Sequence, residues 1–211
     1  MEELLEAIRK GDRARVASLL DGDSSLVDGP ALLQAIYNGR ADLVPLFLER
    51  GHRLSFHEAA AYGDAVRMIE LLDRDPALLD SFGDDGFNAI GLAVFFRHPE
   101  IARMLIERGA DVTAHARNPM KVAPVHAAAT QGDRELMQLL LDHGADPNAT
   151  QQMDYVPLHS SAGRNDVETA RLLIARGADP KRKTCDGKTP ADIARERGFE
   201  ELAALLDGVQ S

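Results

Sequence analysis

A short break between two apolar segments, most often a glycine, recurs at a near-constant interval along this chain. This break constrains the fold more than any other feature of the sequence. When each short alanine-rich segment is aligned on the residue that ends it, one column holds Gly11, Gly39, Gly63, Arg97, Gly132, Asn165 and Gly198. The last four intervals in this column are 34, 35, 33 and 33 residues. A fixed period of this length is typical of proteins in which small structural units stack side by side. We therefore expect seven stacked repeats.

Two further motifs recur with the same spacing. They are a Gly-Ala-Asp triplet that starts at Gly109, Gly144 and Gly177, and a proline at Pro124, Pro157 and Pro190. Proline is tolerated in the first turn of a helix, and glycine is common just after the end of one. Each repeat is therefore predicted to hold a short alanine-rich helix and a second helix with leucines three and four residues apart on one face.

Two segments show the complete pattern, VAPVHAAATQGDRELMQLLLDHGADPNA and YVPLHSSAGRNDVETARLLIARGADPKR. They resemble ankyrin repeats, whose pattern is TPLHxAA, a glycine, an apolar helix and GADVN. The resemblance covers nearly the whole chain and is strongest from about Gly83 to Leu206. It implies an all-α ankyrin-repeat solenoid of about seven helix pairs with β-turn fingers on one edge, of the bacterial, cytoplasmic type. The repeats of this single domain are expected at residues 1–28, 29–53, 54–82, 83–116, 117–150, 151–183 and 184–211.

The chain departs from the ankyrin pattern at both ends and in the middle. The first three repeats are short, so stunted loops are expected there. Repeat five carries two extra residues in its entry loop, HARNPMKVAP, which predicts a longer finger. In the last repeat Asp192 and Arg195 replace the histidine and the second alanine, as suits a terminal cap that faces water.

Charge and composition restrict the partners and the compartment. The chain has 34 acidic and 24 basic residues, and a net charge of −10 repels the phosphates of nucleic acids and anionic lipids. The single cysteine, Cys185, suits a reducing compartment. Neither a signal-like start nor an apolar run of membrane-spanning length is present. We expect a cytoplasmic monomer with no membrane or nucleic-acid partner.

Three histidines, His57, His126 and His159, recur at the start of the first helix of their repeats. Zinc needs ligands that converge on one point, whereas these lie one or more repeats apart. We therefore expect each histidine to order its own helix, and we expect no metal or cofactor. The ankyrin pattern places threonine three residues before the histidine, where this chain has Ala123 and Val156. Threonine at either position should raise the melting temperature, because it restores a helix cap.

The common sequence motifs of catalysis are absent from this chain. The chain has no glycine-rich phosphate loop, no GxSxG and no HExxH, and Cys185 has no candidate base beside it. The sequence therefore predicts a protein with no enzymatic activity.

Aromatic residues gather at the positions through which ankyrin proteins bind. The resemblance implies a concave partner-binding face made of the finger tips and the two positions before each break. All three tyrosines and three of the seven phenylalanines fall there, and aromatic anchors dominate the binding energy of many interfaces. The predicted protein-binding residues are Tyr37, Tyr62, Phe87, Phe95, Phe96, Met120, Met153, Tyr155 and Arg164. Alternatively, Phe95 and Phe96 fill a gap left by the shortened loops. The loop from His115 to Val122 is where we first expect a partner to make contact.

Positive charge gathers around the last finger, at Lys181, Arg182, Lys183 and Lys188. Arg164, Arg195 and Arg197 are expected on the same side. This cluster is either a solvated loop or a device that steers an acidic partner segment. An alternative function is recognition of an anionic small molecule or nucleic acid by this finger.

Overall fold

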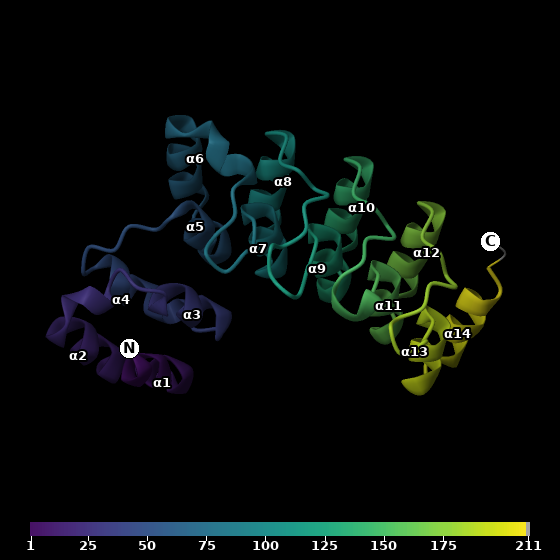
Figure 1. Ribbon diagram of the computed structural model, residues 1–211, viewed down its shortest axis with the longest axis horizontal. Helices are drawn as coiled ribbons and strands as arrows, with labels where there is room; N and C mark the ends of the chain where they lie inside the picture. The colour runs from purple at the N-terminus through teal and green to yellow at the C-terminus, as the bar shows by residue number, and fades with distance from the viewer. Residues whose placement is uncertain (210–211) are drawn as a thin grey trace. The chain divides into compact units, whose positions relative to one another are not determined.

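The computed structural model describes residues 1–209, and the regular structure in this range is helical apart from an isolated bridge between Phe82 and Asn88 (Figure 1). The chain forms two compact units, Met1–Leu78, called here the N-unit, and Leu79–Ser211, called the C-unit. Each unit is built from helix pairs, as the resemblance predicts. The single domain and the repeat boundaries expected from the sequence stay predictions.

The N-unit contains the first three helix pairs. They are α1 (Glu2–Lys10) with α2 (Arg13–Gly22), α3 (Ala31–Tyr37) with α4 (Val44–Leu48), and α5 (Phe56–Tyr62) with α6 (Ala65–Arg74). A short 3₁₀ turn at Ser24–Leu26 lies between α2 and α3, and another at Ala41–Leu43 lies between α3 and α4. Helix α3 packs between α1 and α5. Leu4, Leu32, Phe47 and Met68 are fully buried in the core of this unit.

A buried histidine of the N-unit contacts side chains from two separate segments. His52 is 7% exposed, and its ring lies between two carboxylates, with Nδ1 at 3.2 Å from Asp28 Oδ1 and Nε2 at 3.1 Å from Glu58 Oε2. Glu58 also accepts the backbone N–H of Ser55 at the start of α5. His52 therefore links the loop before α3 to the cap of α5.

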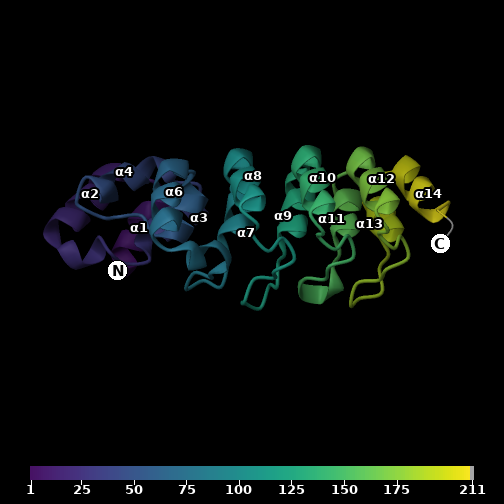
Figure 2. The same cartoon turned by 90° about the horizontal axis from the view of Figure 1, so that it is seen from above.

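The C-unit contains the other four pairs. They are α7 (Ala89–Phe95) with α8 (Pro99–Glu107), α9 (Pro124–Gln131) with α10 (Arg134–Asp142), α11 (Pro157–Gly163) with α12 (Val167–Ala175), and α13 (Pro190–Glu196) with α14 (Glu200–Asp207). The first member of each pair is called the inner helix and the second the outer helix. Inner helices pack on inner helices in chain order, and in Figure 2 the loops that precede them project to one side.

The recurring break has one conformation throughout the chain. All seven residues of the column have positive φ, including the non-glycine residues Arg97 at 64° and Asn165 at 57°. The following aspartate often caps the outer helix, as when Asp133 accepts the N–H of Leu136 at 3.0 Å and Asp166 accepts that of Thr169 at 3.0 Å. The break is thus a left-handed turn followed by a helix N-cap.

Each inner helix of the C-unit is preceded by a finger, a loop closed by a backbone hydrogen bond. Three fingers close over the same short span, from Gly83 N–H to the oxygen of Phe87, from Gln151 to Tyr155 and from Thr184 to Lys188. In repeat five the corresponding bond joins Ala116 N–H to the Val122 oxygen. The span is two residues longer, which confirms the expected longer finger.

Backbone hydrogen bonds also connect neighbouring fingers. Arg117 N–H donates to the oxygen of Gly86 at 2.7 Å. In the same way Gln152 donates to Met120 at 3.0 Å, and Cys185 to Met153 at 3.0 Å. The four fingers therefore form one connected row.

The recurring histidines of the C-unit start their helices as expected. His126 Nδ1 accepts the N–H of Ala123 at 3.0 Å, and His159 Nδ1 accepts that of Val156 at 3.1 Å. In the last repeat Asp192 plays this part, because its carboxylate accepts the N–H of Thr189 at 3.0 Å while Thr189 Oγ1 accepts the N–H of Asp192 at 3.2 Å. Asp192 thus replaces the histidine in function as well as in position.

Candidate protein-binding face

The structure places the predicted binding residues at different levels of exposure. In the C-unit, Phe95 is 44% exposed, Met120 48% and Met153 53%, and Arg164 is exposed as well. Phe87, Phe96 and Tyr155 are half-buried. Tyr37 and Tyr62 belong to the N-unit, where they end α3 and α5 and are also half-buried. The exposed side of the inner helices of the C-unit, together with its fingers, is called here the inner face.

Two phenylalanines end the first inner helix of the C-unit. The rings of Phe95 and Phe96 meet edge to face, with centroids 5.1 Å apart and an interplanar angle of 87°. The backbone oxygen of Phe95 accepts a hydrogen bond from Gln131 Nε2 at 3.0 Å, which joins this helix end to the next repeat. The half-buried Phe96 packs against Phe95, whose side chain is exposed to solvent.

Arginines bind the carboxyl ends of the inner helices. The backbone oxygen of Gln131 accepts from Arg97 Nη2 at 3.1 Å and from Arg164 Nη2 at 3.4 Å. Arg197 Nη1 donates to the oxygen of Gly163 at 2.8 Å. Carbonyl groups at a helix end lack partners within the helix and carry a partial negative charge, so guanidinium groups are favoured there.

A hollow of about 240 Å³ lies on the inner face between α11 and its neighbours. It is lined by Thr130, Tyr155, His159, Ser160, Gly163, Arg164, Ile193 and Arg197. The rings of Tyr155 and His159 are 5.3 Å apart on one side of it. Burial lowers the pKa of His159, so this imidazole is neutral at pH 7 and the two arginines carry the charge of the lining.

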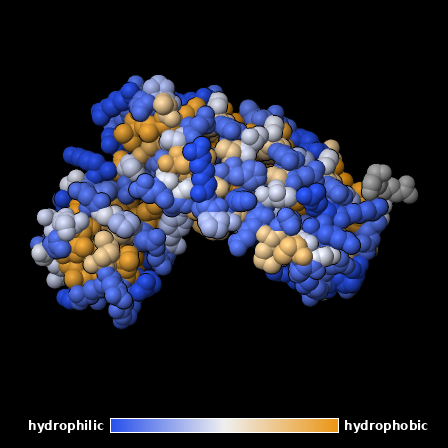
Figure 3. Space-filling view, viewed as in Figure 1, coloured by the Kyte–Doolittle hydropathy of each residue, from blue (hydrophilic) through white to orange (hydrophobic). Residues whose placement is uncertain are grey.

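The finger tips carry two exposed methionines. Met153 and the next residue, Asp154, have φ of 64° and 58°, as at the central positions of a type I′ turn. The backbone oxygens of Met120 and Met153 both accept bonds from the following finger. Because the backbone is fixed in this way, the methionine side chains extend from a rigid edge. Figure 3 shows a mostly hydrophilic surface on the side of the C-unit that it displays, with a small apolar patch near the fingers.

The basic cluster predicted around the last finger divides into two groups. Lys181, Arg182 and Lys183 are exposed, and no carboxylate of the described residues forms an ion pair with them. By contrast, Lys188 Nζ lies 2.7 Å from Glu196 Oε2. Arg195 Nη2 lies 2.7 Å from Asp207 Oδ2. The charges of Lys188 and Arg195 are therefore balanced within the chain.

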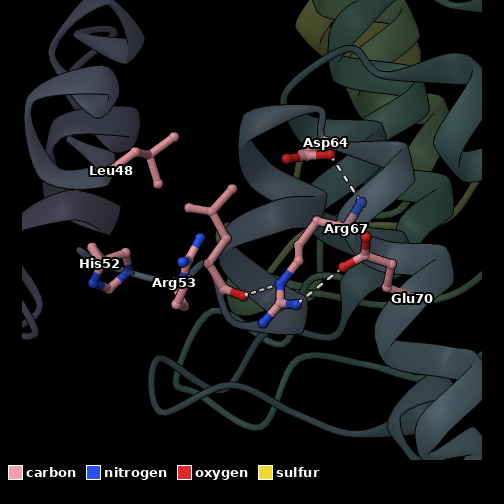
Figure 4. A pocket seen from close by; sticks show the side chains of 7 residues that line it. Leu48, His52, Arg53, Asp64, Arg67 and Glu70 are labelled. Carbon is pink, nitrogen blue, oxygen red and sulfur yellow. Dashed lines mark hydrogen bonds and ion pairs between the residues drawn. The ribbon is translucent and has the colours of Figure 1, made fainter.

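A second hollow, in the N-unit, was not predicted from the sequence (Figure 4). The Arg67 side chain lies across it, donating to the backbone oxygen of Leu54 at 3.0 Å and pairing with Glu70 at 3.3 Å. Asp64 caps α6 through the N–H of Arg67. These polar groups already have partners, so the arrangement supports the helix pair rather than a ligand.

No group of three or more histidine, cysteine, aspartate or glutamate side chains able to hold a metal ion occurs in residues 1–209. Over the same range, no helix has the length and apolar character needed to cross a membrane.

The family comparison follows the repeats seen in the structure. The model described as ankyrin repeats (3 copies) matches residues 4–116 and again 125–209. The chain belongs to the ankyrin repeat family. The left-handed breaks, the fingers and the histidine-initiated inner helices described above are the parts from which its repeats are built.

This chain covers less than half of the length of each of three relatives that it matches. The nuclear factor NF-kappa-B p105 subunit of Gallus gallus is 34% identical over 162 residues, which cover 75% of this chain and 13% of that protein. A putative ankyrin repeat-containing protein of Treponema pallidum is 29% identical over 125 residues, covering 54% and 41%. The NAD-capped RNA hydrolase NUDT12 of Homo sapiens is 38% identical over 56 residues, covering 26% and 12%. These relatives come from animals and a bacterium, and the bacterial type of this chain stays a prediction.

Proposed function

We propose that this chain is a non-catalytic module that recognises a partner protein through its inner face. Ankyrin repeats generally mediate protein–protein interaction. The observation that carries the proposal is the exposure of Phe95, Met120 and Met153 on the inner helices and fingers of the C-unit. Isolated apolar side chains on a surface need no explanation, but here they stand on rigid backbone along one face. The tyrosines Tyr37 and Tyr62 extend the proposal to the N-unit.

The same proposal assigns an electrostatic part to the last finger. Lys181, Arg182 and Lys183 lie exposed on a chain of net charge −10, so they present a local positive field to an approaching acidic segment. Replacing all three by glutamine should slow association and reduce its dependence on salt. An association rate that does not change with salt would argue against steering. We further propose that the protein is a cytoplasmic monomer.

The binding proposal is tested by affinity capture with the intact chain as bait. Wild-type protein and a Phe95→Ala, Phe96→Ala, Tyr155→Ala variant are exposed side by side to the same native lysate. We expect a protein that is retained by the wild type and lost from the variant. A matched bait with Val66→Ala, which removes a 70% exposed side chain from the outer helix α6, should retain it.

Circular dichroism and thermal melting of each bait separate binding from folding. The proposal requires that the triple variant keeps a cooperative melt while it loses the partner. The triple variant could instead unfold, while the single variants Phe95→Ala and Phe96→Ala bind the partner with unchanged affinity. That result would show that these rings fill a packing gap.

A further inference from the structure

We infer that the hollow beside α11 receives an acidic side chain, glutamate or aspartate, from an extended segment of the partner protein. This inference rests on the proposed function, because it names the chemistry of the segment that the inner face binds.

The charge of the lining is the first observation. Acidic residues outnumber basic ones by 34 to 24 in this chain, yet none lines the hollow. Its charged side chains are Arg164 and Arg197. The nearby Lys188 is balanced by Glu196 at 2.7 Å, so the two arginines supply the local positive charge. An anion is the ligand that complements such a lining.

The hydrogen-bonding state of the arginines is the second observation. Arg164 donates to Gln131 at 3.4 Å and Arg197 to Gly163 at 2.8 Å, and neither forms an ion pair within the described residues. A guanidinium has five N–H donors in a rigid fork that matches a carboxylate. These bonds direct each guanidinium toward a helix end, more closely for Arg197 than for Arg164. The remaining N–H groups of the two arginines are available to a ligand.

The shape of the hollow is the third observation, and it depends on a glycine. A Cβ placed on Gly163 would lie 3.5 Å from Ile193 Cγ2 and 3.6 Å from Arg197 Cζ. The missing side chain therefore leaves room directly beside one guanidinium. The Ile193 methyl group and the Tyr155 ring make part of the wall apolar, and reduced contact with water strengthens a charge-assisted hydrogen bond.

These features favour a carboxylate on a polypeptide over a phosphate. The hydroxyls of Thr130, Ser160 and Tyr155 suit a small polar side chain, and the exposed Phe95 and Met153 offer apolar contacts to residues that flank it. A polyanion would meet the net charge of −10 on the rest of the chain. The occupant we infer is thus an acidic residue with apolar neighbours.

The experiment uses a phage-displayed random peptide library selected on the intact wild-type chain. The most enriched peptides are synthesised, and their Kd values are measured by fluorescence anisotropy. We expect each to contain an acidic residue, and we expect Arg164→Gln or Arg197→Gln to weaken binding by about tenfold or more. The matched control Arg176→Gln, at an exposed arginine that ends α12 and pairs with Asp142, should bind as the wild type does.

A double-mutant cycle identifies the contact even where an arginine variant is less stable. Replacing the peptide's acidic residue by its amide should weaken binding to the wild type, with little further effect on the arginine variants. Enriched peptides without an acidic residue, or arginine variants that bind within twofold of the wild type, would overturn the inference. Displacement of the peptides by inorganic phosphate at millimolar concentration would assign the hollow to phosphate instead.

The outcomes also separate this inference from the proposed function. Peptides that need Phe95 but not the arginines would leave protein binding by the inner face in place and reject the acidic occupant. A library that yields no binder would count against both.

Discussion

His126 Nε2 donates to the backbone oxygen of Ala149 at 2.8 Å, while Nδ1 of the same ring accepts from Ala123 at 3.0 Å. One buried imidazole therefore starts its own inner helix and holds the loop that leads into the next repeat. His159 repeats the arrangement with the Lys188 oxygen at 3.2 Å. Both contacts require the neutral ring, because one nitrogen must accept.

This arrangement predicts that the protein loses stability in mild acid. Burial lowers the pKa of His126 from 6.5 to about 4, so between these values the unfolded chain binds a proton that the folded chain does not. The contribution is complete above pH 6.5 and falls as the pH drops toward 4, by on the order of 3 kcal/mol in all. Urea denaturation from pH 7.5 to 4.5 measures it. His126→Gln should flatten the slope, and an unchanged slope would refute this cause.

Completing the helix caps of repeats five and six should stabilise the fold. Thr189 shows the full reciprocal cap, whereas Ala123 and Val156 supply no side-chain acceptor. Val156→Thr should raise the free energy of unfolding by about 1 kcal/mol and the melting temperature by roughly 2–4 °C. Thr189→Val should lower both by similar amounts. Differential scanning calorimetry checks the pair, and equal shifts in the same direction would contradict the capping account.

Alanine substitutions at two glycines measure how much the contact between neighbouring fingers contributes to stability. Gly86 and Gly187 both have positive φ, at 80° and 83°, so alanine is strained at either position. A Cβ at Gly86 would also lie 2.9 Å from the backbone of Arg117, whereas none of the described atoms approaches that at Gly187 within 4 Å. Gly86→Ala should therefore lower the free energy of unfolding by at least about 1 kcal/mol more than Gly187→Ala does. Equal losses in denaturant titrations would mean that the finger contact contributes little.

If the Phe95 ring serves binding rather than packing, its removal should be tolerated. We expect Phe95→Ala to change the free energy of unfolding by less than about 1 kcal/mol, because Phe95 is 44% exposed. Leu105→Ala, at a fully buried residue of the same helix pair, should cost about 2–5 kcal/mol. Chemical denaturation of the two variants compares them, and similar losses would place Phe95 in the core.

Much of the fold was predictable because it depends on local sequence. The breaks, the helix starts and the finger lengths depend on residues close to one another in the sequence, so the spacing of those residues predicts them. The two added residues between Ala116 and Val122 are an example. The candidate face was only partly predictable. The alignment of the repeats assigns Phe95, Tyr155 and Arg164 to this face. Whether an aromatic ring there is exposed to solvent depends on the packing between repeats.

The hollow illustrates what spacing does not encode. It lies where Gly163 meets Arg197 of the next repeat. The nearby Lys188 pairs with Glu196, so the positive charge of the lining comes from the two arginines. In the N-unit, the position of His52 between Asp28 and Glu58 likewise joins segments whose meeting is not evident in any repeat pattern. Such relationships depend on side-chain directions that only the assembled structure defines.

The row of fingers has a mechanical consequence. The bonds from Arg117 to Gly86, from Gln152 to Met120 and from Cys185 to Met153 follow one another along the row, so a pull on its ends loads them in series. Elements in series each carry the full force, and the weakest gives way first. Single-molecule stretching of the C-unit should therefore show extension in steps of one repeat, and a single all-at-once rupture would show that the repeats share the load.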